Sequence, residues 1–94
     1  MADVKPYWQN YINGAWVDGG ASRIDVTDPA TGERIAEHAL ADAADVDRAE
    51  QAARRVHLSG ALTAMRPIVR GRMVQALGRY LLDHTDEIAR ILTL

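Results

Sequence analysis

The sequence predicts an α+β fold in which two β-hairpins precede three α-helices. Two turn signals predict the hairpins: an Asn-Gly pair stands between short runs of strand-forming residues at 11–17, and a Pro and a Gly bracket a second turn at 29–32. Beyond position 42, apolar residues recur every three or four positions, which is the period of an amphipathic helix. We therefore assign residues 1–40 to hairpins and residues 41–94 to helices.

The first hairpin is predicted to turn at Asn13 and Gly14. Both residue types tolerate the positive φ angles that a tight two-residue turn requires. The Gly19-Gly20 pair then interrupts the extended pattern. Because a strand and not a helix follows this pair, we predict an ordinary loop rather than a phosphate-binding turn.

The second hairpin is predicted to pair residues 24–27 with residues 34–40. Pro29 fixes its own φ and favours an extended conformation at Asp28, while Gly32 can adopt the positive φ that closes such a turn.

The first helix is predicted to cover residues 43–56. Asp42 is a suitable N-cap, and the acidic Asp45 suits the positive end of the helix. A narrow apolar stripe follows the helical period, at Val46, Ala49, Ala53 and Val56. Residues 57–65 are predicted to form a connector.

The second helix is predicted to begin at Pro67, because the missing N–H of a Pro costs nothing in a first helical turn. Gly71 and Gly78 lower its helix propensity, and close packing of a neighbouring backbone would compensate for them. Its apolar face is broader than that of the first helix and consists of Val69, Met73, Ala76, Leu77, Tyr80 and Leu81.

A third helix is predicted after residues 83–86, which offer side chains that could cap it. Its apolar stripe is still running at Leu94, without a Gly, a Pro or a basic last turn. We therefore expect the chain to be the amino-terminal piece of a larger protein. The later apolar stripes exceed what the Ala-rich first helix can cover, so we expect the isolated chain to be marginally stable.

Composition excludes several classes of protein. The sequence contains no Cys, so disulfides, thiolate metal sites and a Cys nucleophile cannot occur within these residues. Its first residues lack the apolar run of a secretory signal, and no stretch approaches the roughly 18 apolar residues of a membrane span. We therefore expect a soluble cytoplasmic protein that does not enter a membrane.

Charge is distributed unevenly along the chain. Residues 1–50 carry four basic and ten acidic side chains, whereas residues 51–80 carry six Arg and no acidic residue. Such a stretch could bind nucleic acid or an acidic partner as a small stand-alone module. The alternative is a solvated helix face or a partner for acidic surface of the same protein. The spread of the Arg residues among apolar ones, at helical spacing, favours this alternative.

No complete catalytic or metal-binding motif is present. The three His residues are far apart and do not follow the spacing of metal ligands. His84, between Asp83 and Asp86, is the local candidate for proton transfer or ligand binding, although simple capping explains it as well. Asp25 and Asp28 could face a cation, but turn formation alone accounts for Asp28.

Four segments together resemble the opening of the aldehyde dehydrogenase superfamily: residues 11–16, 26–33, 41–49 and 86–93. Pro67 and Arg70 fit the same pattern. The resemblance implies that these residues belong to the amino-terminal segment of an α/β aldehyde dehydrogenase-like fold, with the remainder of that fold as their partner. It also implies a homo-oligomeric parent enzyme.

The parent activity implied by the resemblance is oxidation of an aldehyde to a carboxylic acid with NAD or NADP, through a thiohemiacetal and a thioester. The family's nucleophilic Cys, its Glu base, its oxyanion-hole Asn and its Rossmann-type cofactor site lie downstream of these residues. The resemblance therefore assigns no catalytic and no cofactor-binding residue here, and we expect the chain alone to be inactive.

One site is implied in part. Several family members hold a monovalent cation, K+ or Na+, with backbone carbonyls immediately before an Asn-Pro or Asp-Pro turn, and Val26 and Thr27 occupy those positions. The acidic residue that usually assists would follow Leu94, so we expect this chain to hold an incomplete site.

The sequence departs from the family pattern at three positions. His57 stands where an aromatic residue is usual, Leu62 where a Trp is common, and Val69 where an acidic residue often occurs. These departures leave two alternatives for the parent, an active enzyme or a degenerate relative.

Overall fold

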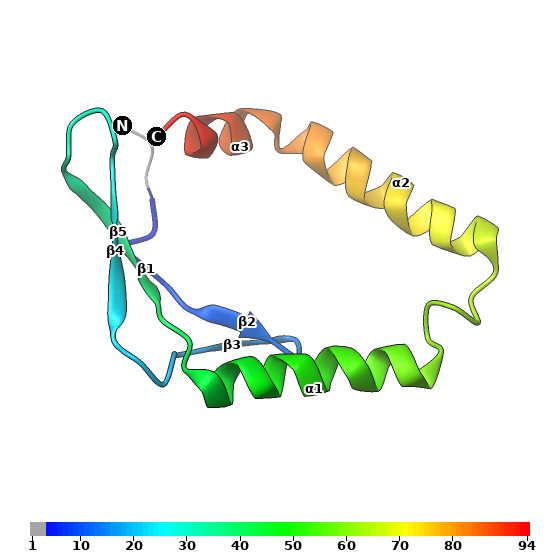
Figure 1. The fold of residues 1–94 in the computed structure, drawn as a ribbon. Coiled ribbons are helices and arrows are strands. Elements are labelled where there is room, and N and C mark those ends of the chain that lie inside the picture. Colours follow the sequence, from blue (N-terminus) through cyan, green and yellow to red (C-terminus); the bar gives the residue numbers. More distant parts are fainter. Residues whose placement is uncertain (1–3) are drawn as a thin grey trace. The chain divides into compact units, whose positions relative to one another are not determined.

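The computed structural model describes residues 4–94, which form five strands followed by three helices (Figure 1). Within this range the chain divides into two compact units. One contains residues 4–55 and the other contains Val56–Leu94.

The first hairpin has the predicted turn. Strand β2 (Asn10–Ile12) pairs antiparallel with β3 (Ala15–Val17), so that Tyr11 lies opposite Trp16. Asn13 and Gly14 have φ angles of 52° and 78°, which is the double left-handed conformation of a type I′ turn.

The second hairpin joins β4 (Arg23–Thr27) to β5 (Arg34–Ala39), again antiparallel and again as predicted. A β-bulge interrupts the pairing between Val26 and Thr27. In the turn, the peptide N–H of Ala30 donates to the Asp28 carboxylate at 2.8 Å, and Gly32 has a φ of 75°.

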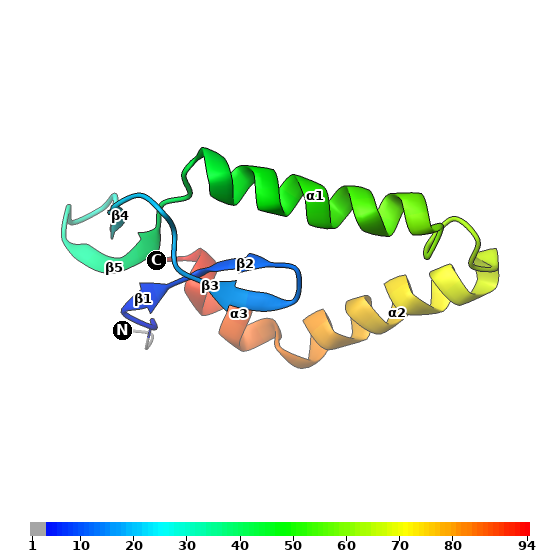
Figure 2. The same cartoon turned by 90° about the horizontal axis from the view of Figure 1, so that it is seen from below.

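A fifth strand was not predicted. Strand β1 (Tyr7–Trp8) runs parallel to β5, with Tyr7 opposite Glu37, and completes a sheet in the order β1-β5-β4. It leads directly into β2 (Figure 2). A two-residue strand is too short to show the alternation of apolar and polar residues by which strands are recognised, and its partner lies about thirty positions further along the chain.

Helix α1 (Ala43–Ser59) begins where predicted and extends three residues beyond the predicted end at Val56. The first residues of the predicted connector, including His57, are therefore helical. Gly60 adopts a φ of 73° immediately after the helix, which is the usual left-handed position of a terminating Gly.

Helices α2 (Pro67–Asp83) and α3 (Thr85–Leu92) follow, and α2 begins at the predicted Pro. The Arg70 guanidinium fastens the preceding connector by donating to the carbonyls of Leu62 at 3.1 Å and Met65 at 2.6 Å.

The predicted capping of α3 by residues 83–86 is wrong, because no side chain caps its first turn. The Thr85 hydroxyl instead lies within hydrogen-bonding distance of the carbonyls of Leu81 and Leu82, at 3.1 and 2.8 Å. A single residue, His84, separates the two helices. The hydroxyl therefore lies beside the last carbonyls of α2, which have no partners within that helix.

Few apolar side chains are buried. The buried hydrophobic residues of the described part of the chain are Ala36 and Ala39, both on β5. On α2, Leu77 is 59% exposed, and a Cβ atom added at Gly71 or Gly78 would meet nothing within 4 Å. The close backbone packing expected at these two Gly residues is therefore not present in residues 4–94. Within the same range, no helix has the length and apolar character needed to cross a membrane.

Candidate functional site

Val26 and Thr27 lie at the bulge, directly before the Asp28 turn. A bulge disrupts the regular hydrogen-bond ladder and changes the direction of the local peptide groups. The nearby carboxylates are engaged elsewhere: Asp28 accepts hydrogen bonds within its own turn, and Asp25 lies 3.6 Å from Arg34. No group of three metal-ligating side chains occurs in residues 4–94.

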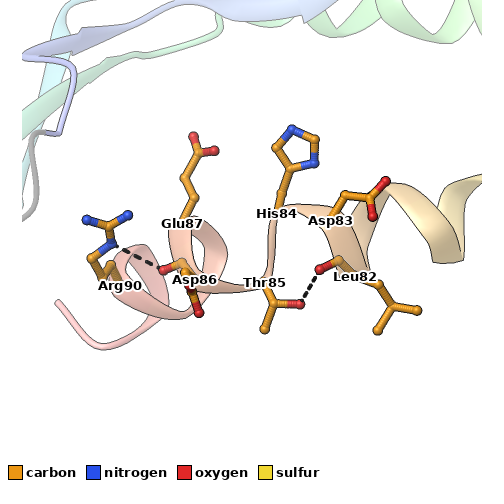
Figure 3. A pocket seen from close by; sticks show the side chains of 7 residues that line it. All are labelled: Leu82, Asp83, His84, Thr85, Asp86, Glu87 and Arg90. Carbon is orange, nitrogen blue, oxygen red and sulfur yellow. Dashed lines mark hydrogen bonds between the residues drawn. The ribbon is translucent and has the colours of Figure 1, made fainter.

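A pocket lies at the junction of α2 and α3, but the polar side chains that line it do not converge on one point (Figure 3). His84 stacks on the ring of Tyr80 with 4.0 Å between centroids, and its Nδ1 atom lies 2.8 Å from the Tyr80 carbonyl oxygen. In Figure 3, His84 and Glu87 point to one side, whereas Asp83 and Asp86 point in other directions. The structure therefore does not bring His84 together with Asp83 and Asp86 as one site.

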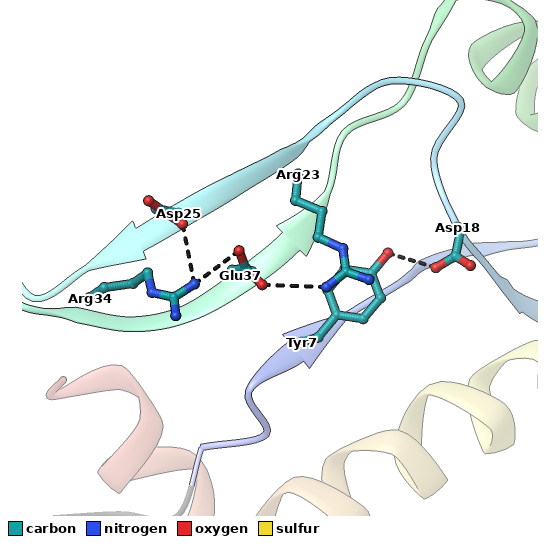
Figure 4. A network of polar contacts seen from close by, with 6 residues as sticks. All are labelled: Tyr7, Asp18, Arg23, Asp25, Arg34 and Glu37. Atoms are coloured by element: carbon teal, nitrogen blue, oxygen red, sulfur yellow. Dashed lines mark hydrogen bonds and ion pairs between the residues drawn. The ribbon is translucent and has the colours of Figure 1, made fainter.

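A polar network crosses the sheet β1-β5-β4 (Figure 4). The Tyr7 hydroxyl donates to the Asp18 carboxylate at 2.6 Å, and the Arg23 guanidinium lies 3.7 Å from the centre of the Tyr7 ring. Ion pairs then run from Arg23 to Glu37 at 3.4 Å and from Glu37 to Arg34 at 2.9 Å.

The Tyr7 hydrogen bond raises the pKa of Tyr7 and lowers the pKa of Asp18. Charges alternate in sign along this network, and each charged group has a partner. The network fastens β1 to its neighbours and presents no poised acid or nucleophile. The sequence does not reveal this network, because its members are scattered over residues 7–37.

Asp45 is the most deeply buried side chain among residues 4–94, with no exposed surface. Its Oδ2 atom accepts the peptide N–H groups of Gly20 at 2.6 Å and Asp42 at 2.9 Å, and its Oδ1 atom pairs with Arg48. Asp42 returns the bond by accepting the Asp45 N–H at 2.9 Å, so the two residues cap α1 reciprocally. The N–H of Gly20, followed by that of Asp42, lowers the pKa of Asp45.

The predicted Gly19-Gly20 loop has a packing role. A Cβ atom at Gly19 would overlap the Leu40 backbone carbonyl, and one at Gly20 would overlap the Asp42 carboxylate. Gly19 is therefore required by its close approach to the backbone at Leu40, whereas a side chain at Gly20 would displace the Asp42 carboxylate that caps α1. We name Gly19, Gly20, Asp42, Asp45 and Arg48 the α1 clamp.

The Arg residues of the basic stretch are partly engaged by other groups, and those of α2 do not share one face. Arg54 pairs with Glu50 at 3.2 Å, and Arg70 is occupied by backbone carbonyls. Arg72 and Arg79 lie on roughly the opposite side of α2 from Arg70, because an α-helix has about 3.6 residues per turn. The described structure therefore gives no specific support to the Arg-rich nucleic-acid module.

The sequence matches the family model described as the aldehyde dehydrogenase family over residues 16–94. The chain belongs to the aldehyde dehydrogenase family. It corresponds to an amino-terminal segment of that family, and the structure has the expected order of two hairpins before three helices.

Several curated relatives of this aldehyde dehydrogenase segment match almost its whole length. It is 35% identical to a malonate-semialdehyde dehydrogenase of Listeria monocytogenes over 100% of the chain and 19% of the relative. It is 38% identical to malonate-semialdehyde dehydrogenase 1 of Oceanobacillus iheyensis over 94% of the chain and 18% of the relative. It is 35% identical to the cytosolic 10-formyltetrahydrofolate dehydrogenase of Xenopus tropicalis over 94% of the chain and 10% of the relative. No solved structure matches it.

The chain thus spans about a fifth or less of the relatives named here. The polar clusters of this aldehyde dehydrogenase segment hold strands, loops and helix ends together. The Asp42 cap is predictable from the sequence, whereas the role of Gly19 and Gly20 is not, because the Gly pair itself is its only sequence signal.

Proposed function

We propose that these residues form the structural amino-terminal part of an NAD(P)-dependent aldehyde dehydrogenase that oxidises an aldehyde to a carboxylic acid. The match to the family model over residues 16–94 carries the proposal. The thiol chemistry of such an enzyme requires a Cys, and this sequence has none. In this proposal, the nucleophile and the cofactor site belong to other parts of the enzyme.

The role of this segment is to pack against the remainder of the enzyme. Exposed apolar residues on α2 support this role, since Met73, Leu77 and Leu81 are each about half exposed or more. Contiguous apolar surface of this kind marks an interface in soluble proteins. The proposal extends to a homo-oligomeric enzyme in the cytoplasm.

We also propose that the backbone carbonyls of Val26 and Thr27 contribute to binding of K+ or Na+ in the whole enzyme. Hard cations take several oxygen ligands. The bulge at these two residues supports the proposal, because it changes the local direction of their peptide groups on β4, which is an edge strand of the sheet.

The activity is tested with the whole polypeptide that contains these residues. The purified protein is mixed with NAD+ or NADP+ and a panel of aldehydes that includes malonate semialdehyde, and cofactor reduction is followed by absorbance. We expect aldehyde-dependent reduction with the whole polypeptide and the no-protein baseline with the 94-residue chain. Turnover by the purified short chain, or none by the whole polypeptide with any aldehyde, would refute the proposal.

The cation site is tested by exchanging salts at constant ionic strength. We expect K+ or Na+ to raise the thermal midpoint of the whole enzyme above its value in N-methylglucamine, which is too large for a carbonyl site. Thr27→Ala should keep this difference, because the proposed ligand is the backbone carbonyl and not the hydroxyl. Equal midpoints in all three salts would exclude the site.

A further inference from the structure

Asn13 has an environment that favours a chemical modification. It is exposed at the tip of the β2–β3 hairpin and is followed by Gly14. Gly has no Cβ, so its peptide nitrogen is more accessible to a neighbouring carbonyl carbon than that of any other residue. Asn is also among the chemically labile residue types.

Arg55 approaches the same side chain from α1. Its Nη2 atom donates to the Oδ1 atom of Asn13 at 3.2 Å. A guanidinium is always charged, and a charged donor on a carbonyl oxygen withdraws electron density from the carbonyl carbon. The same donor stabilises the negative charge that develops on the oxygen when a nucleophile adds to Cγ.

We propose that Asn13 is a site of deamidation and that Arg55 promotes the reaction. The peptide nitrogen of Gly14 gives its proton to a solvent base and attacks Cγ of Asn13. A nitrogen–carbon bond forms, the Cγ–Nδ2 bond breaks, and ammonia leaves after taking up a proton. Water then opens the resulting succinimide at either carbonyl carbon and yields Asp or isoaspartate at position 13. The net change is an amide and water converted to a carboxyl group and ammonia.

The two products affect the hairpin differently. An Asp-Gly pair suits the same type I′ turn, and the new carboxylate lies beside Arg55 as an ion-pair partner. Isoaspartate adds a carbon to the backbone, so a two-residue turn can no longer keep Tyr11 opposite Trp16. The ring centroids of that pair, 4.9 Å apart in the native hairpin, should separate. This inference does not depend on the proposed enzyme activity.

Asn10 is an internal control, since the sequence contains these two Asn residues only. It lies within β2, opposite Val17, and is followed by Tyr11. Its Nδ2 atom is buried. Both the bulky following residue and the paired strand hinder ring closure at Asn10.

The experiment incubates the purified chain at neutral and mildly alkaline pH and follows each Asn by peptide mass spectrometry. Isoaspartate is detected with a protein carboxyl methyltransferase and labelled S-adenosylmethionine. We expect loss of the Asn13 peptide and appearance of two products, faster at higher pH, while Asn10 persists. Equal conversion at both positions, or none at Asn13, would overturn the proposal.

The role of Arg55 is tested with Arg55→Ala, and Arg54→Ala is the matched control on the neighbouring residue. Loss of the charged donor should slow conversion roughly three- to tenfold, whereas Arg54→Ala should leave the rate unchanged. In denaturant, Arg55→Ala and the unaltered chain should react equally, which separates the hydrogen bond from any effect on folding. An unchanged or faster rate for folded Arg55→Ala would refute the role of Arg55.

Discussion

The two units differ in how far along the chain their side-chain hydrogen bonds reach. In residues 4–55 they join Gly20 to Asp45 across 25 positions and Arg55 to Asn13 across 42. Among the described side-chain bonds of Val56–Leu94, the longest reach is the 8 positions from Arg70 to Leu62. The first unit is therefore held by tertiary contacts of its own, whereas the second consists of helices stabilised mainly by local bonds.

Apolar surface shows the same contrast. The buried hydrophobic residues Ala36 and Ala39 belong to the first unit, whereas α2 leaves Val74 and Leu82 at least 70% exposed. Since helices gain most of their stability in proteins from packing an apolar face, we infer that the second unit depends on the remainder of the aldehyde dehydrogenase fold. The first unit also exposes large apolar side chains, Tyr11 and Val46 among them, but its long-range hydrogen bonds make it less dependent on that remainder.

Adding a methyl group to one Gly in each unit should produce the largest difference. Gly19→Ala places a Cβ atom against the Leu40 carbonyl and should destabilise the first unit by roughly 3 kcal/mol. Gly78→Ala meets nothing within 4 Å and should stabilise α2 by about 0.5–1 kcal/mol. Trp8 and Trp16 both lie in the first unit, so their fluorescence follows its unfolding. Circular dichroism follows all three helices, so unfolding of α2 and α3 is the part of its change that fluorescence does not share. The two substitutions should change the free energy of unfolding in opposite directions. If Gly19→Ala left the stability of the first unit unchanged, the close approach of Gly19 to Leu40 would not constrain the α1 clamp.

A charge on the α2 face should reveal what covers that face. In the 94-residue chain, Leu77→Lys should change stability by no more than about 0.5 kcal/mol and should reduce binding of an apolar dye. In the whole enzyme it should cost several kcal/mol, because an unpaired charge would be buried. Denaturant titration of both forms measures the difference. Gln75→Lys, on the same helix but outside the apolar stripe, is the control. Equal effects of Leu77→Lys in the two forms would show that the remainder of the enzyme leaves this face uncovered.

The elements were largely predictable because their signals are local. Asn13-Gly14 specifies its own turn, and Pro67 marks the start of α2 through its backbone geometry alone. The end of α1 was predicted too early because Val56 is the last residue of its apolar stripe, whereas the backbone continues to Ser59.

The clamp and β1 were not predictable in the same way, because they depend on contacts between distant residues. No residue close to Gly20 in the sequence indicates that its N–H donates to Asp45. Strand β1 has two residues, which are too few to show the alternation of apolar and polar side chains typical of a strand. The backbone carbonyls of Val26 and Thr27 are candidate cation ligands only through the resemblance to the family, and their role in cation binding stays a prediction. His84 is a candidate for proton transfer or ligand binding because acidic residues flank it in the sequence, but the side chains of Asp83 and Asp86 point in other directions (Figure 3).

Acid should weaken the first unit through Asp45. The folded pKa of Asp45 lies below its ordinary value, so its stabilising contribution is fully present above about pH 4 and is lost as pH falls through the lowered folded pKa. Tryptophan fluorescence during acid titration should show the loss. Asp45→Asn should remove part of this pH dependence, and Asp18→Asn should remove a separate part, since the pKa of Asp18 is also lowered. An unaltered acid profile in Asp45→Asn would contradict the assignment.

The smallest effect is expected at the exposed pair of Glu50 and Arg54. Both side chains are more than half exposed, and their atoms lie 3.2 Å apart. Glu50→Gln should cost about 0.5 kcal/mol or less, and high salt should abolish the difference. Thermal unfolding at low and high salt measures it. A cost above that of Asp45→Asn would invert the expected order of the contacts within the first unit.

Hydrogen exchange of the 94-residue chain, resolved by segment with mass spectrometry, tests the contrast between the units most directly. We expect slow exchange in β4, β5 and the first turns of α1, and fast exchange in α2 and α3. We also expect α2 to become protected in the whole enzyme. Equal protection of both units in the short chain would contradict the dependence of the second unit on the remainder of the fold.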